Sequence, residues 1–277
     1  MTEWVPRGQE LERLLRLRTF PLGLTLLRAR EDLERVKCAR PETISSLCQL
    51  ITRSRTAGTT IGFTVTDIAP LCATVVGLKS VPPDSFLLAV GESWFKDRET
   101  ALEKYAPENF PRIPHEYEAA VLSPLAAGRL EPDMVLLYGS PAQMTRLVCG
   151  LQWEHYEKLK MTCCGESSCS DSIGLCYTTG KPAVAIPCFG ERKFGHAQDD
   201  ELMAALPPGS VDTLIAGLKA LDRVGIRYPI VFAGAQADLA RGFPPRYWEE
   251  TLKDNEYEKN RIAGRLTEDD GETPGQS

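Results

Sequence analysis

Apolar residues recur with helical spacing in several separate parts of this chain. In residues 6–18, Leu11, Leu14, Leu15 and Leu17 alternate with charged residues at intervals close to i, i+3 and i+4, which indicates an amphipathic helix. A second helix is predicted at 43–53, with Thr43 or Ser45 as its cap. Further helical patterns occupy residues 97–105, 141–149 and 210–221. Each of these five patterns predicts a helix, most of them with one buried face.

Short apolar or β-branched runs separate these helices and predict strands. They lie at residues 22–27, 59–65, 85–90, 134–138 and 182–187. Most are bounded by glycine or proline, as buried strands commonly are. The alternation of strands with helices predicts an α/β or α+β layered fold, with a mixed sheet covered by helices.

The chain changes character near its C-terminal end. Residues 251–277 carry seven acids and four bases, and residues 267–277 contain no large apolar side chain. Such a segment cannot bury enough surface to offset its ordering entropy. We therefore expect one domain over 1–243, a C-terminal extension over 244–266 and a disordered tail over 267–277.

Composition and charge narrow the function classes. Of 277 residues, 43% are hydrophobic and 25% are charged, which is typical of a packed globular protein. Thirty-eight acids against 32 bases give a net charge of -6, so a nucleic-acid partner is not expected. No run approaches the ~18 apolar residues of a membrane span, and charges interrupt the N-terminal segment. We expect a cytoplasmic protein without a membrane partner.

Nine cysteines are the unusual feature of this composition, and five of them fall between positions 163 and 188. In a reducing compartment, clustered thiolates select zinc, copper(I) or an iron–sulfur cluster. Structural zinc usually takes two close C-x(2–4)-C pairs, whereas this chain has one at best. The irregular spacing is better suited to a cluster held in a cleft by several loops.

Local pattern separates some of these cysteines. Cys169 begins a helix that stops at Gly180, and the positive end of a helix favours a thiolate. Cys188 follows a strand, at a position where ligands meet in α/β sheets. Cys163 and Cys164 are adjacent and project differently, so they are not expected to bind the same iron. Spacing alone predicts a structural role for the remaining five: Cys38, Cys48, Cys72, Cys149 and Cys176.

Several blocks of the sequence resemble domain-of-unknown-function family 169. They are GESSCSDS at 165–172, TGKPAVAIPCFGER at 179–192, 199–201 with Pro207, 47–49 with Arg53, 72–78, 132–137 and 141–143. The resemblance covers roughly residues 10 to 221, with the blocks in the family's order. The family is common in anaerobic bacteria and archaea, and its cysteines suggest iron–sulfur or other metal binding.

The resemblance also selects among the cysteines. Cys48, Cys72, Cys169 and Cys188 occupy family-motif positions, whereas Cys163, Cys164 and Cys176 do not. It therefore implies that Cys48 and Cys72 are candidate metal ligands too, despite their distance in sequence from the other two.

Other polar residues are weaker candidates. Arg53 and Arg55 precede Ala57-Gly58, and such a basic turn can grip the carboxylate or phosphate of a bound cofactor or substrate, with Arg53 as the candidate. His196 is either a nitrogen ligand, a proton donor or a solvated loop residue. Residues 199–201 predict the acidic first turn of a short helix at 202–206, and the alternative is an acid/base pair. Nucleotide-binding, α/β-hydrolase and zinc-protease motifs are absent from the sequence.

The leading hypothesis is a cytoplasmic iron–sulfur protein of anaerobic metabolism with a four-iron cluster. Its ligands would be Cys169, Cys188 and one or two of Cys48, Cys72 and Cys164. With three ligands, one iron stays open, and reductive or sulfur-transfer chemistry on a small molecule would follow. The alternative is a non-catalytic small-molecule or metal-binding module with structural cysteines or a structural zinc. Whether the protein is an enzyme, and its oligomeric state, are left open at this point.

Overall fold

The computed structural model describes residues 3–230 and 245–263. The chain divides into two compact units, Met1–Pro229 and Ile230–Ser277. The described part of the second unit is helix α11 (Pro245–Ile262). The tail expected to be disordered, residues 267–277, lies outside the described residues.

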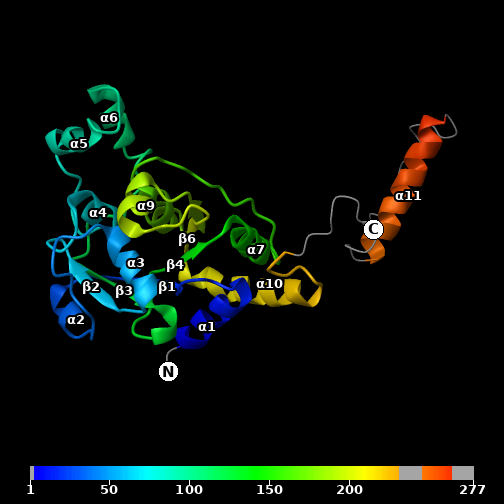
Figure 1. The fold of residues 1–277 in the computed structure, drawn as a ribbon, viewed down its shortest axis with the longest axis horizontal. Coiled ribbons are helices and arrows are strands. Elements are labelled where there is room, and N and C mark those ends of the chain that lie inside the picture. The colour runs from blue at the N-terminus through cyan, green and yellow to red at the C-terminus, as the bar shows by residue number, and fades with distance from the viewer. Residues whose placement is uncertain (1–2, 231–244, 264–277) are drawn as a thin grey trace. The chain divides into compact units, whose positions relative to one another are not determined.

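A six-stranded sheet forms the centre of the first unit (Figure 1). Its order is β2-β3-β1-β4-β6-β5, and each neighbouring pair is antiparallel. The strands are β1 (Leu22–Leu27), β2 (Ile61–Thr64), β3 (Ala119–Pro124), β4 (Met134–Gly139), β5 (Ala183–Ala185) and β6 (Leu202–Leu206). The α+β class is confirmed, with antiparallel pairing between the named strands where a mixed sheet was expected.

Helices cover the sheet. Those of the first unit are α1 (Trp4–Leu15), α2 (Arg30–Glu34), α3 (Leu47–Ala57), α4 (Pro70–Val75), α5 (Asp84–Gly91), α6 (Arg98–Lys104), α7 (Pro141–Leu151), α8 (Leu175–Thr179), α9 (Phe189–Gly195) and α10 (Val211–Arg223). A π-helical stretch, η2 (Ser170–Gly174), runs directly into α8. Short 3-10 turns occupy Leu125–Ala127 and Pro208–Ser210.

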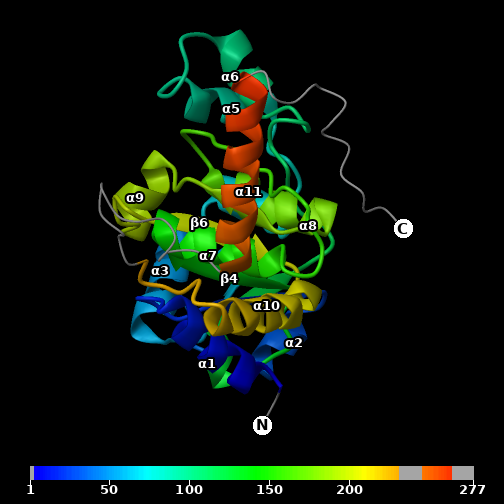
Figure 2. The ribbon, with the colours of Figure 1, turned by 90° about the vertical axis from the view of Figure 1, so that its right-hand side faces the viewer.

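The two faces of the sheet carry separate hydrophobic cores because strand side chains alternate between them. On one face, Leu24 and Leu136 pack with residues of α3, α4 and η2. On the other face, Val135 and Leu137 pack with α1, α7 and α10. Helices α5 and α6 form a smaller cluster beyond the sheet and lie at the top of Figures 1 and 2. The first unit therefore has three layers, helix on sheet on helix.

Two predicted elements are wrong in type. The apolar run 85–90 belongs to helix α5, which packs beside α6 and not in the sheet. Short apolar runs fit either a buried strand or a buried helix turn, and tertiary packing decides between them. Residues 202–206 form β6, not a helix, because they lie between β4 and β5 and bond to both. Here strand pairing overrides the helical preference of leucine, methionine and alanine.

The helix predicted at 43–53 begins later than expected. Ser46 is the cap of α3, and its hydroxyl and the side chain of Gln49 form a reciprocal capping box. This start places Cys48 in the first turn of α3. Within the described residues, no helix is long and apolar enough to cross a membrane.

Candidate functional site

Four cysteines from four separate chain segments meet on one face of the sheet. Cys48 lies in the first turn of α3, Cys72 in α4, Cys169 just before η2, and Cys188 at the cap of α9. The thiol of Cys169 interacts electrostatically with those of Cys72, Cys188 and Cys48. These are the four cysteines that occupy family-motif positions, and the structure brings all of them together.

Hydrogen bonds tie the four segments to one another around the sulfur atoms. The N–H of Leu47 donates to Sγ of Cys72 at 3.3 Å, which joins the start of α3 to α4. Sγ of Cys48 lies 3.8 Å from the carbonyl oxygen of Gly190 in α9. The N–H of Cys188 donates to Oγ of Ser168 at 3.0 Å, next to Cys169. The thiols of Cys48 and Cys72 thus each contact backbone from another segment, and the backbone of Cys188 is tied to the segment that carries Cys169.

Burial governs the protonation of these thiols. It raises the pKa of Cys48 to about 12 and that of Cys72 to about 11, and nearby thiols add to both shifts. Burial and the neighbouring thiols raise the pKa of Cys169 well above its usual range. Without a positive partner, these groups stay protonated near neutral pH. Four thiolates in this place need a cation to offset their mutual repulsion and desolvation.

All nine cysteines are free thiols. Among residues 3–230 and 245–263, no three histidine, cysteine, aspartate or glutamate side chains are arranged to hold a single metal ion. The thiols of Cys48, Cys72 and Cys188 all interact electrostatically with that of Cys169, so the four form one group of donors. Four cysteine thiolates are the ligand set of an iron–sulfur cluster.

Helices α3 and α9 approach closely beside the cluster. A Cβ on Gly195 would lie 2.7 Å from the Cβ of Cys48 and 3.1 Å from its carbonyl oxygen. Only glycine at position 195 permits this approach. The approach brings Cys48 close to helix α9, whose cap is Cys188.

A buried carboxyl lies beside the thiols. Oγ of Ser168 donates to Oε2 of Glu191 at 2.5 Å, and the hydroxyl of Tyr138 donates to Oε1 of the same carboxyl. The N–H of Glu191 donates to Sγ of Cys188 at 3.4 Å. Burial raises the pKa of Glu191, although these hydrogen bonds act to lower it. Glu191 therefore connects the β4 strand to both segments that carry Cys169 and Cys188.

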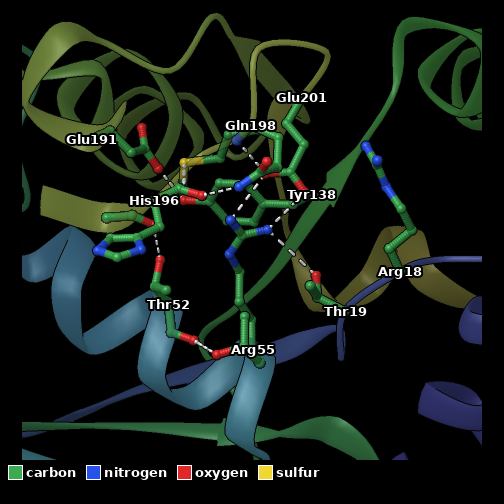
Figure 3. Close-up of polar contacts among 12 residues, drawn as sticks. Arg18, Thr19, Thr52, Arg55, Tyr138, Glu191, His196, Gln198 and Glu201 are labelled. Atoms are coloured by element: carbon green, nitrogen blue, oxygen red, sulfur yellow. Dashed lines mark hydrogen bonds and ion pairs between the residues drawn. The ribbon is translucent and has the colours of Figure 1, made fainter. Parts of the chain in front are cut away.

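A second buried polar group adjoins this one and is drawn in Figure 3. Nη1 and Nη2 of Arg55 donate to the two carboxylate oxygens of Glu201 at 3.0 and 2.9 Å. The guanidinium also lies over the ring of Tyr138, 4.0 Å from its centroid. Arg55 is 2% exposed and Glu201 is 4% exposed. The two opposite charges of this ion pair therefore compensate each other within the core.

No sequence pattern marked Glu191. The sequence placed Glu201 in an acidic helix turn and Arg55 in a basic turn, and it did not predict that the two are buried together. One signal was available for Arg55, because it lies four residues after Ile51 on the stripe of α3 that faces the core. No local signal identifies Glu201 as its partner, since the two are far apart in sequence.

The other predicted site residues lie elsewhere. Arg53 is exposed on α3, and His196 is exposed at the end of α9 with positive φ. Cys164 lies at the edge of the cluster, where burial and the carboxylate of Asp171 raise its pKa. Together with Cys163 it lines a surface pocket of about 440 Å³. Cys164 thus borders both this pocket and the four-cysteine set, because its thiol interacts with that of Cys188.

The fold and site define an α+β protein with a buried cluster of four free cysteines. Residues 10–217 match the profile of DUF169, described as an uncharacterised ArCR family. The chain therefore belongs to the DUF169 family. It is 27% identical over 158 residues to the uncharacterized protein MJ0308 of Methanocaldococcus jannaschii, an alignment that spans 55% of this chain and 66% of that protein. No solved structure matches the chain.

Proposed function

We propose that this protein binds an iron–sulfur cluster of the four-iron type through Cys48, Cys72, Cys169 and Cys188. The observation that carries the proposal is the meeting of four free thiols from four separate segments in one buried region. Four cysteine thiolates are the usual ligand set of such clusters. A cytoplasmic location suits the site, because free thiols persist in a reducing compartment.

The arrangement favours a cluster over a structural zinc. Structural zinc sites are usually built from two close C-x(2–4)-C pairs, whereas these four cysteines come from four separate segments. An iron–sulfur cluster spreads its ligands over several irons. The soft thiolate set without histidine also suits iron and sulfide.

Backbone N–H groups support the same assignment. Leu47 and Glu191 donate to the sulfurs of Cys72 and Cys188, at 3.3 and 3.4 Å. Hydrogen bonds to cysteine sulfur stabilise the thiolate and tune the reduction potential of a bound cluster. These donors come from the starts of α3 and α9, so the fold itself supplies them.

The activity that this ligand set favours is electron transfer. Four ligands leave no iron open, in contrast to the three-ligand arrangement that would support reductive or sulfur-transfer chemistry. The position of Cys188 suits electron exchange, since it is followed by Phe189, which is 58% exposed and contacts the ring of Trp94. A partner that touches this surface would come close to one ligand of the cluster.

Anaerobic purification of the full chain tests the proposal. We expect a brown protein with charge-transfer absorption and about four irons and four sulfides per chain. Cys48→Ser, Cys72→Ser, Cys169→Ser and Cys188→Ser should each lose most of the iron, because a hydroxyl is a harder and far less acidic ligand than a thiolate. The measurements are iron and sulfide content and the visible spectrum.

The matched controls are Cys38→Ser, Cys149→Ser and Cys164→Ser, which change a partly buried cysteine outside the four-thiol set. Each should keep its iron. A colourless protein with one zinc, or with no metal after reconstitution, would refute iron–sulfur binding and support a structural-zinc or non-metal module. If one of the four serine variants keeps full iron, the cluster has an open iron and electron transfer is the wrong activity.

A further inference from the structure

A second cavity of about 610 Å³ lies between the end of α7, the following loop, the start of α8 and the start of α10. No cysteine is among the described residues that line it. Its volume is within the range of about 300–1,000 Å³ that is typical of small-molecule sites. It is therefore a separate candidate site, independent of the cysteine cluster.

The wall of this cavity is largely apolar. Val148 and Leu151 from α7, with Leu159 from the loop, pack behind it against the core beneath α1, α7 and α10. Leu175 and Pro182 complete the apolar lining. All five are only partly buried, so they present apolar surface that a ligand can cover. Covering such surface removes apolar area from water, which favours binding.

The charged residues of the lining are mostly basic. Nζ of Lys181 is 2.5 Å from the carboxylate of Glu157, so these two charges compensate each other. Lys158 and Lys160 also line the cavity, and neither forms an ion pair or side-chain hydrogen bond with any residue that the structure describes. The lining therefore keeps two uncompensated positive charges, with His155 as a further polar group beside them.

We propose that this basic pocket binds a small amphipathic anion, an apolar chain or ring that ends in a carboxylate. The apolar part would cover Val148, Leu151 and Leu159, and the carboxylate would pair with Lys158 and Lys160. A neutral ligand of the same shape leaves both lysines unpaired, and a cationic one is repelled by them. The lining thus selects by charge as well as by apolar area.

Calorimetric titration of the full chain at low ionic strength tests the pocket. The probes are octanoate, octan-1-ol and octylamine, which share an apolar chain and differ in the charge of the head group. Octanoate should bind at least about tenfold more tightly than octan-1-ol, and octylamine should bind more weakly than either. The double variant Lys158→Glu/Lys160→Glu should weaken octanoate binding by at least about tenfold and leave octan-1-ol binding nearly unchanged.

The matched control is Lys37→Glu/Lys96→Glu, which makes the same change of net charge at two exposed lysines outside the pocket. It should bind octanoate as the parent does. The neutral double variant Lys158→Gln/Lys160→Gln should lose octanoate affinity to an intermediate extent. It replaces the charge-reversed variant in the comparison if charge reversal changes the thermal melt. Three outcomes would each overturn the proposal. They are equal affinity for octanoate and octan-1-ol, an equal loss of octanoate affinity in Lys158→Glu/Lys160→Glu and in the Lys37→Glu/Lys96→Glu control, and no octanoate binding at all. None of these outcomes depends on iron content.

Discussion

Two polar regions are buried side by side on the α3 face of the sheet, and they differ in how their charges are compensated. The Arg55–Glu201 pair contains both an acid and a base, joined by two hydrogen bonds and stacked on Tyr138. The four-cysteine cluster contains four groups of the same kind, whose negative forms repel one another. The first region balances its charges with residues of the chain, whereas in the second the thiols are neutral, and four thiolates there would need a positively charged group to compensate them.

Under the proposed function, this difference assigns a structural role to the ion pair and a binding role to the cysteine cluster. A buried ion pair with matched partners has no need of a ligand, and removing one partner leaves an isolated charge in the core. Neutral thiols pack as small apolar groups and contribute little electrostatic stability until they ionise. The pair should therefore determine the stability of the metal-free protein, while the cluster should determine what the protein binds.

Breaking the ion pair gives the largest expected effect. Glu201→Gln leaves the charge of Arg55 buried without its counter-ion, so the metal-free protein should lose about 3–5 kcal/mol of unfolding free energy. Urea denaturation at neutral pH measures this loss. The double variant Arg55→Met/Glu201→Leu removes both charges and should fall within about 1 kcal/mol of the parent. A Glu201→Gln variant as stable as the parent would show that the pair is not structural.

The same pair predicts a pH dependence with a definite sign. Burial acts to raise the pKa of Glu201, but hydrogen bonds from Arg55 and from the N–H of Gln198 outweigh it and hold the pKa below its ordinary value. A depressed carboxyl pKa gives stability that is present above the unfolded value of about 4.3 and is lost as pH falls through the folded value. The stability gap between the parent and Glu201→Gln should therefore stay constant near neutral pH and narrow as the pH falls below about 4.3 and through the lowered pKa of Glu201. A gap that widens toward acid pH would contradict this assignment.

The smallest expected effect on stability comes from the cluster. Cys72→Ala in the metal-free protein should cost on the order of 1 kcal/mol, because it removes one sulfur from a partly buried position and leaves no unpaired charge. The same substitution should remove most of the iron from the reconstituted protein. Paired measurements of denaturation and iron content check both statements. A loss as large as that of Glu201→Gln would mean that the thiols are structural, and the contrast between the two regions would fail.

Local sequence determined much of the secondary structure and, at the candidate site, the helix that begins near Cys169. The helical stripes of α1, α3, α7 and α10 and the runs of β1 and β4 are visible in the sequence because 3.6-residue and two-residue periods are short-range properties. The Gly180 stop of the helix that begins near Cys169 is also local, since its positive φ favours glycine.

Tertiary structure decided whether the short apolar runs at 85–90 and 202–206 form a helix or a strand. Neither run is long enough to show a hydrophobic period that distinguishes the two. Tertiary structure also decided the partner of Arg55, which is 146 positions away in sequence. Family motifs marked Cys48 and Cys72 as candidates, but only the packing of α3 and α4 beside α9 joined them to Cys169 and Cys188. Spacing along a chain carries no information about such meetings, because contacts between distant segments depend on how whole helices and strands pack.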